Sequence, residues 1–295
     1  MSVRIRPSIQ DALQRGDAVV ALESTVISHG LPRPHNLALA RRLEHTVRDA
    51  GAVPATVGVI RGELVVGLDD DDLDYLANHD VAKASLWNLA ALVARGESAG
   101  TTVATTLHGA SLAGIRVFAT GGIGGVHDPT SFDESADLSA LARYGLIVVC
   151  AGAKSILNVA ATRERLETLG VPIIGYRSDR LAGFYVPTTA YPVAARCDSP
   201  EEVAGAFEAQ QALSLGTGLV LSNPVSEGLE PSELAAWTSQ AKAEATAQGR
   251  HGHALTPYLL ARLAELSEGR SVETNTRLLV ENAKLASEVA RALCR

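Results

Sequence analysis

One stretch near the middle of the chain constrains the fold most, because it joins an apolar strand pattern directly to a turn of small residues. Leu146–Cys150 is apolar and rich in β-branched side chains, which is typical of a fully buried parallel strand. Three small residues follow and lead into Lys154. Ser155 is a suitable N-cap for a helix that ends near Gly170. The pattern predicts a strand, a turn and a helix, with Lys154 at the carboxyl end of the strand.

The position of Lys154 indicates a possible chemical role. Open α/β sheets bind their ligands at the carboxyl ends of their strands. A cation near a helix N-terminus opposes the helix dipole, which favours the neutral amine, and a neutral amine is a nucleophile towards carbonyl carbon. An exposed lysine on a loop is the alternative, and this stretch alone does not decide between the two.

The composition narrows the class of protein. With 295 residues, 46% of them hydrophobic, the chain can bury one large core, so we predict a single α/β domain over residues 1–295, with two domains as the alternative. A net charge of −7 without a basic cluster argues against a nucleic-acid partner. No apolar run reaches the ~18 residues of a membrane span, and the N-terminus lacks the apolar core of a signal peptide. Three widely spaced cysteines fit a reducing compartment, so we expect a cytoplasmic protein with no membrane contact.

Two further strand patterns end in polar or glycine-rich residues. Asp17–Glu23 reads as a strand whose last residue, Glu23, is either a salt-bridged or capping residue or a general acid. Ile115–Thr120 leads into the glycine cluster Gly121–Gly125, which either exposes amide groups to an anion or permits a tight turn. Lys83 lies among small residues and is ambiguous alone.

Acidic residues cluster in two places. Asp133 and Asp137 are four residues apart, so they can lie on one face of a helix start and reach a hard cation such as Mg²⁺ or Mn²⁺. N-capping by Asp133 or Ser135 explains the same residues equally well. The run Asp69–Asp72 is more typical of a solvated loop or a helix start than of a metal site.

The remaining patterns predict helices and one hairpin. Asn36 is expected to cap a helix over Leu37–Ala50, and Pro54–Ile60 and Glu63–Gly67 are expected to form two strands around a tight turn. Further helices are expected at Glu201–Leu215, Pro231–Gln248, Pro257–Ser267 and Val272–Leu293.

The last predicted helix carries two asparagines on one face. Asn275 and Asn282 are seven residues apart, which is two helical turns. A buried asparagine pair can recognise a polar ligand, or it can belong to an ordinary hydrogen-bond network between helices.

Four stretches form a specific pattern when they are read together. They are Glu23–Gly30, Phe118–His127, Phe132–Leu138 and Val149–Leu157. Together they closely resemble the pseudouridine-5'-phosphate glycosidase family, and the resemblance runs over roughly residues 8–293. It implies a three-layer α/β/α fold with a mixed, largely parallel central sheet, a homotrimer, and a divalent metal, usually Mn²⁺. It also implies reversible cleavage of a C–C glycosidic bond, in which pseudouridine 5'-phosphate and water become uracil and ribose 5-phosphate.

The resemblance assigns roles to single residues. Lys154 resembles the family's nucleophilic lysine, which would form an iminium (a Schiff base), and Glu23 resembles its proton donor. The positions that resemble substrate-binding residues are Lys83, Val103 and the segment Ser135-Ala136-Asp137, while Asp133 resembles the metal ligand. We add Asn282 to the substrate-binding set because of the asparagine spacing in the last helix.

The chain departs from the family pattern shortly after Lys83. The usual Arg-Arg-Asp is replaced by Leu86-Trp87-Asn88, and Glu134 stands where an apolar residue is common. The replacement of Arg-Arg-Asp makes the part of the site next to Lys83 less polar and better suited to an aromatic aglycone. Alternatively, it is neutral drift at a subunit contact. Two alternatives therefore stand beside uracil release. One is a C-ribosyl synthase that attaches ribose 5-phosphate to an aromatic polyketide, and the other is a non-catalytic sugar-phosphate-binding protein.

Overall fold

The structure is a computed structural model that describes residues 3–31, 33–130, 132–249 and 255–294. The strands are β1 (Val3–Ile5), β2 (Val19–Leu22), β3 (Val53–Ile60), β4 (Glu63–Val66), β5 (Ala82–Ala84), β6 (Ala99–Thr101), β7 (Val117–Ala119), β8 (Val126–Asp128), β9 (Asp133–Glu134), β10 (Ile147–Cys150), β11 (Ile173–Tyr176), β12 (Ala195–Cys197) and β13 (Leu219–Ser222). The helices are α1 (Pro7–Arg15), the π-helical turn η1 (Val26–Gly30), α2 (His35–Asp49), α3 (Asp70–Asn78), α4 (Leu89–Ala94), α5 (Val103–Ala113), α6 (Ala136–Arg143), α7 (Val159–Thr168), α8 (Pro200–Ala212), α9 (Pro231–Ala247), α10 (Leu255–Leu266) and α11 (Arg270–Leu293).

A mixed, mostly parallel sheet of 11 strands forms the centre of the molecule. Its main path runs β1-β4-β3-β2-β7-β10-β13-β11-β12, and β6 pairs with both β3 and β5. Strand β3 is antiparallel to β4 and β6, and the other pairs in this sheet are parallel. Strands β8 and β9 form a separate antiparallel ribbon.

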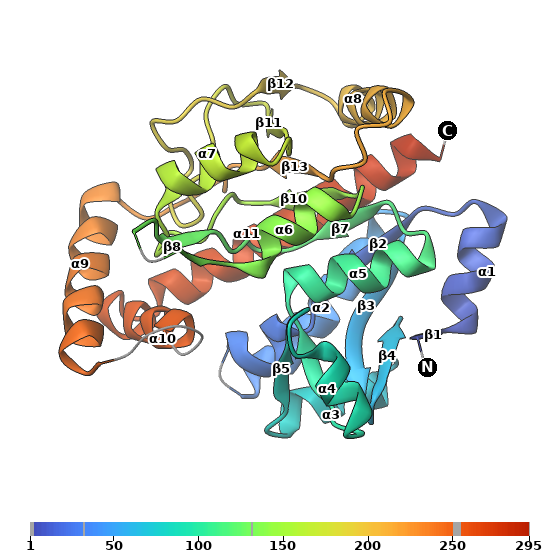
Figure 1. The fold of residues 1–295 in the computed structure, drawn as a ribbon, viewed down its shortest axis with the longest axis horizontal. Helices are drawn as coiled ribbons and strands as arrows, with labels where there is room; N and C mark the ends of the chain where they lie inside the picture. The colour runs from blue at the N-terminus through green and yellow to red at the C-terminus, as the bar shows by residue number, and fades with distance from the viewer. Residues whose placement is uncertain (1–2, 32, 131, 250–254, 295) are drawn as a thin grey trace.

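Helices cover both faces of the sheet, which confirms the predicted three-layer α/β/α fold (Figure 1). Helix α11 crosses behind the strands and packs against α2 and α8, while α5 and α6 lie together on the opposite face and α7 is packed beside α6. Because both faces are covered, the central strands are apolar throughout, and every residue of β2, β10 and β13 is buried.

The parallel arrangement determines where the functional residues lie. Strands β2, β7 and β10 are neighbours and parallel, and each ends at a residue that the sequence analysis singled out or closely precedes one. Glu23 follows β2, Thr120 follows β7, and the turn that holds Lys154 follows β10. These residues therefore meet at one edge of the sheet.

Most predicted elements are present, with one local correction. The hairpin β3–β4 is confirmed, and Asp69 caps α3 by accepting a hydrogen bond from the Asp72 amide, so the acidic run is a helix start. Asn36 is not an N-cap, because α2 begins one residue earlier. Its buried side chain instead donates hydrogen bonds to the carbonyl oxygens of Ile27 and Ala77, both at 2.9 Å.

Among the described helices, none is both long enough and apolar enough to cross a membrane.

Candidate active site

Glu23 is held by two threonine hydroxyls at the ends of neighbouring strands. Its carboxylate accepts hydrogen bonds from Thr25, which precedes η1, and from Thr120, which follows β7. Thr120 is itself fixed, because its amide donates to the Val149 carbonyl oxygen at 3.0 Å. The carboxylate is almost fully buried, at 9% exposure, yet it lines two cavities. Burial and two positioned donors give this carboxylate a defined orientation.

Lys154 is positioned by two small-residue turns that hydrogen-bond to each other. Its amide donates to the Ile123 carbonyl oxygen at 3.1 Å, and the Ile123 amide donates to Gly152 at 3.1 Å. The turn after β10 is thus joined to the glycine cluster after β7. Gly152 has a φ of +86°, which favours glycine because a Cβ would be strained there.

The helix predicted to be capped by Ser155 starts three residues later than expected. Asn158 is the N-cap of α7 and accepts a hydrogen bond from the Ala161 amide at 3.0 Å. Residues 154–157 form a turn instead, because the side chains of Ile156 and Leu157 are drawn into the core. Lys154 therefore does not lie at a helix N-terminus, and the dipole argument for its amine does not apply.

The neighbouring thiol does not compete with Lys154 as a nucleophile. Complete burial raises the pKa of Cys150 to about 12, so it stays protonated near neutral pH.

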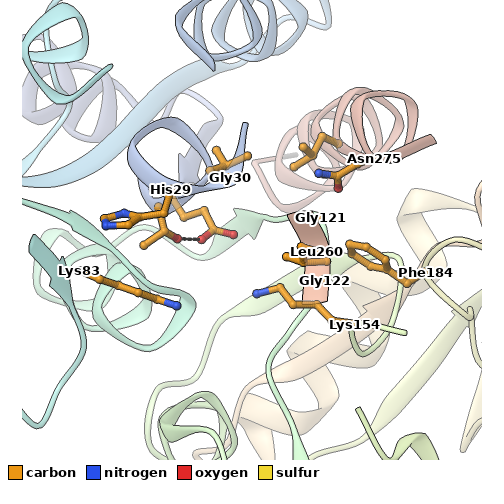
Figure 2. Close-up of a pocket in the computed structure, with 13 residues that line it drawn as sticks. His29, Gly30, Lys83, Gly121, Gly122, Lys154, Phe184, Leu260 and Asn275 are labelled. Carbon is orange, nitrogen blue, oxygen red and sulfur yellow. Dashed lines mark hydrogen bonds between the residues drawn. The ribbon is translucent and has the colours of Figure 1, made fainter. Parts of the chain in front are cut away.

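Lys83 approaches Lys154 from the other side of the site. Figure 2 shows the two amines pointing towards each other across one cavity. Glu23 and its hydrogen-bond donor Thr25 line the same cavity. Burial, followed by the positive charge of Lys154, lowers the pKa of Lys83, although Asp137 and Glu23 oppose this shift. A partly desolvated amine beside a second amine is an arrangement that active sites use to hold lysine in its neutral form.

The first cavity, here called the Phe184 cavity, is mostly apolar and small, at about 80 Å³. The Phe184 ring packs directly on Gly122, where a Cβ would lie 2.6 Å from it. Phe184 also has a φ of +65°, and its amide donates to the Ala151 carbonyl oxygen at 2.8 Å. The cavity is lined by Glu23, Thr25, Val26, His29, Gly30, Lys83, Gly121, Gly122, Lys154, Phe184, Leu260, Asn275 and Leu279.

The second cavity, here called the Ser135 cleft, is larger and more polar, at about 580 Å³. Two helices begin at it, with Thr102 as the N-cap of α5 and Ser135 as the N-cap of α6. The first-turn amides are partly capped by the protein itself, because the Ala104 amide donates to Asp137 and the Asp137 amide donates to the Ser135 hydroxyl. Lys83 and Lys154 also line the cleft, and their amines, together with the positive ends of the helix dipoles, can attract an anion such as a phosphate. Of the predicted substrate-binding residues, those that line it are Lys83, Val103, Ser135, Ala136 and Asp137.

Asp137 has a structural task in addition to its place in the cleft. Its two carboxylate oxygens accept hydrogen bonds from the amides of Gly124, at 2.7 Å, and Ala104, at 3.0 Å. Asp137 thus joins the glycine cluster to the start of α5. The Gly124 amide is consequently taken by the protein's own carboxylate.

Asp133 lies in the Ser135 cleft beside His127, as a metal ligand would require. Burial lowers the pKa of His127 although the Asp133 charge opposes this, so the imidazole tends to be neutral and able to act as a ligand. Within the described ranges, no three His, Cys, Asp or Glu residues come together as a metal-binding cluster.

Asn282 does not reach either cavity. It is fully buried, donates to the Thr120 carbonyl oxygen at 2.8 Å, and accepts from the Asn223 side chain at 3.0 Å. Asn275, two turns earlier on the same helix, lines the Phe184 cavity instead (Figure 2). The two asparagines share a helix face but lie about 10 Å apart along the axis, and only the first reaches the cavity.

Several residues of the site were not predicted from the sequence. Thr25 and Thr120 flank predicted residues directly, so strand-end position was an available signal for them. His29 lines the Phe184 cavity and pairs with the Ser28 hydroxyl at 2.7 Å, while burial and Lys83 lower its pKa. Phe184 and Leu260 come from segments with no sequence signal for a site.

The fold and this site define the class of protein to which the chain belongs. It matches the family described as Indigoidine synthase A like protein over residues 8–292, and it is a member of that family. Its relatives include proteins named pseudouridine-5'-phosphate glycosidase. One from Thermus thermophilus is 55% identical, covering 93% of this chain and 97% of that protein, and one from Escherichia coli is 48% identical, covering 98% and 95%. The resemblance seen in the sequence is therefore confirmed.

Two solved structures share the fold over the whole chain. An indigoidine synthase A-like protein from Thermotoga maritima has a TM-score of 0.92 at 34% identity, covering all of this chain and 97% of that one. The prealnumycin C-glycosynthase AlnA, solved with ribulose 5-phosphate, has a TM-score of 0.91 at 37% identity with the same coverage. A glycosidase and a C-glycosynthase are thus both similar to this chain.

Proposed function

We propose that this protein is an enzyme, formed by a single catalytic domain, that breaks and forms a C–C glycosidic bond at ribose 5-phosphate. The reaction it supports best is pseudouridine 5'-phosphate plus water giving uracil plus ribose 5-phosphate. The observation that carries the proposal is that Glu23 and Lys154 line both cavities. The bond that is cleaved joins the sugar phosphate to the base, so the residues that act on it must be in reach of both fragments.

A C-glycoside has no heteroatom leaving group, so the sugar ring has to open before the base can leave. Glu23 gives a proton to the ring oxygen while the Lys154 amine attacks C1'. The bond from C1' to the ring oxygen breaks as the bond from C1' to nitrogen forms. The threonine hydroxyls on Glu23 keep its carboxyl group oriented towards this step.

A proton is then added to C5 of uracil, which makes C5 tetrahedral. The bond between C1' and C5 breaks next: its electron pair restores the C5–C6 double bond of uracil, while the lone pair of the Lys154 nitrogen makes C1' part of an iminium. Water then adds to the iminium, which releases open-chain ribose 5-phosphate and restores the amine. Lys83, with its lowered pKa, is placed to accept a proton as the Lys154 amine becomes the nucleophile.

The Ser135 cleft suits the sugar phosphate, and a divalent metal fits there with it. Mg²⁺ and Mn²⁺ prefer oxygen ligands, and Mg²⁺ is commonly bound by one or two carboxylates with water and substrate phosphate. Asp133, with His127 beside it, would hold such an ion, most simply Mn²⁺. When bound, the ion would neutralise phosphate charge and order water around the sugar.

The Phe184 cavity favours uracil over an aromatic polyketide as the leaving group. An engineered protein cavity of ~150 Å³ holds one benzene ring, so a cavity of about 80 Å³ suits a single ring better than a fused system. Asn275 also offers an amide donor and acceptor to a base edge. The similarity to a C-glycosynthase keeps the C-ribosyl synthase as the second candidate.

A coupling assay tests the proposal. Ribose 5-phosphate and Mn²⁺ are incubated with uracil or, in parallel, with electron-rich polycyclic aromatics, and products are read by mass spectrometry. A product with uracil supports the glycosidase, and a product only with an aromatic supports the synthase. Borohydride trapping of ribose 5-phosphate on Lys154 tests the iminium, and the absence of any product or adduct would leave a non-catalytic sugar-phosphate-binding protein.

The assembly and location are proposed from the same resemblance. We expect a homotrimer in the cytoplasm, which light scattering and fractionation would test. The free cysteines Cys150 and Cys197 are buried and Cys294 is exposed, an arrangement compatible with a reducing compartment.

A further inference from the structure

Trp87 is the largest side chain on the wall of the Ser135 cleft, and it is left almost uncovered. Its exposed fraction is 82%, yet the residue is part of the cleft lining. In the part of the chain that the structure describes, no acceptor pairs with its indole N–H. An exposed aromatic ring with an unused N–H donor, on the wall of a cleft, can pack on a bound ligand and donate a hydrogen bond to it.

The backbone that carries Trp87 is fixed relative to Lys83. The Asn88 side chain accepts a hydrogen bond from the Ser85 amide at 2.8 Å and donates to the Lys83 carbonyl oxygen at 3.1 Å. The Asn88 amide also donates to the Ser85 carbonyl oxygen at 3.1 Å. These bonds hold the backbone on both sides of Trp87, and Trp87 and Lys83 line the same cleft.

The same cleft is also lined by polar residues, which include His127, Asp133 and Ser135 at the start of α6. A ligand held in the cleft would therefore meet these polar groups as well as the indole of Trp87.

Trp87 lies on the sugar-phosphate side of the proposed arrangement. It lines the Ser135 cleft but not the Phe184 cavity, where the aglycone is proposed to bind. On the proposed function, the exchange at residues 86–88 therefore alters contacts to the sugar phosphate.

We propose that Trp87 is a ligand-binding residue of the Ser135 cleft, where its indole covers bound ribose 5-phosphate and donates its N–H to a phosphate oxygen. The identity of this ligand rests on the proposed function. Covering the cleft removes the indole from water and shields the Lys154 iminium from bulk solvent.

Tryptophan fluorescence tests this directly, because the chain has two tryptophans. The other, Trp237 on α9, lies under the Arg270 guanidinium at 4.8 Å and lines neither cavity. A Trp237→Phe variant thus leaves Trp87 as the single reporter. We expect ribose 5-phosphate to shift its emission to the blue in a saturable manner, with ribose alone giving a much weaker response.

Substitution of Trp87 supplies the second measurement. Trp87→Ala is expected to raise the Kd for ribose 5-phosphate about tenfold by calorimetry, in the range found when buried aromatic contacts are truncated. Trp87→Phe keeps an aromatic ring but lacks the N–H, so its Kd should lie between those of the unmodified protein and Trp87→Ala. Trp237→Phe is the matched control and should bind as the unmodified protein does.

The outcomes separate this inference from the proposed function. If the unmodified protein neither binds ribose 5-phosphate nor forms a borohydride adduct, the proposed function fails and this inference with it. If it does both while the Trp87 emission and the Trp87→Ala Kd stay unchanged, only the inference is overturned. A Trp87 emission that is already blue without ligand and shifts to the red on dilution would show that a second copy covers the indole, which also overturns it.

Discussion

Replacing Asn282 with leucine distinguishes a structural role for this residue from the ligand-binding role that its spacing suggested. The buried carboxamide joins three segments, because it donates to the Thr120 carbonyl oxygen and accepts from the Asn223 side chain. Leucine has a similar volume but can make neither bond. The substitution therefore leaves the buried Thr120 carbonyl oxygen and the half-buried Asn223 side-chain donor without this partner.

The magnitude follows from those two groups. Each buried polar group left unsatisfied costs about 1–3 kcal/mol. The added apolar burial of leucine returns about 1 kcal/mol. For two such groups, we therefore expect Asn282→Leu to lower the free energy of unfolding by about 1–5 kcal/mol. Since Thr120 also holds Glu23, kcat should fall, while the KM for the substrate should change little.

Urea unfolding followed by circular dichroism measures the stability change, and steady-state kinetics measure kcat and KM. Asn275→Leu is the matched control on the same helix face. It should leave stability nearly unchanged and raise KM, because Asn275 lines the Phe184 cavity. A loss of stability below ~0.5 kcal/mol for Asn282→Leu, together with a raised KM, would refute the reasoning.

Four further substitutions test other parts of the site. Lys154→Ala should abolish turnover and the borohydride adduct while leaving the circular dichroism spectrum unchanged; appreciable residual turnover would exclude the iminium. Glu23→Ala should bind ribose 5-phosphate by calorimetry but turn over about 10²–10⁴-fold more slowly, as expected for a lost general acid; normal turnover would show that another group is the acid. Lys83→Met should raise the melting temperature at pH 7 and lower activity, because burial lowers the pKa of Lys83 and its charged form destabilises the folded state. This gain should shrink as the pH rises from the lowered pKa through the ordinary value of 10.5, and a gain that grows with pH would contradict it. Gly122→Ala should cost about 1–3 kcal/mol in thermal unfolding, because its Cβ would lie 2.6 Å from the Phe184 ring, and an unchanged melting temperature would contradict that packing.

The convergence of Glu23, Thr120 and Lys154 follows from local sequence patterns. Each lies at or just beyond the end of an apolar strand, and the carboxyl ends of neighbouring parallel strands share one edge. Strand order did not have to be known, because any parallel sheet that contained these three strands would place their ends on the same side. The apolar pattern that predicts each strand therefore also predicts that the site lies at the carboxyl edge of the sheet.

The errors concern polar residues whose partners are distant in the sequence. Ser155 has the composition of an N-cap, but burial of Ile156 delays the helix to Asn158. Asn36 and Asn282 each bond to carbonyl oxygens in segments that only the folded chain brings near. The local sequence identifies a polar side chain that needs a hydrogen-bond partner, but it does not show which partner the folded chain will bring near.

The division of the site into two cavities explains why Glu23 and Lys154 lie where they do. The Ser135 cleft lies at the start of two helices and is lined by two lysines, which suits a phosphate, while the Phe184 cavity is mostly apolar and suits a planar ring. A bond between a sugar and a base can be cleaved only where both fragments are held at once, so the reacting carbon must lie at the junction. Glu23 and Lys154 line both cavities and therefore occupy that junction. Bond formation needs the same geometry, because the two fragments must then be brought to one carbon from opposite sides. In the proposed mechanism, one arrangement of acid and amine thus serves both directions.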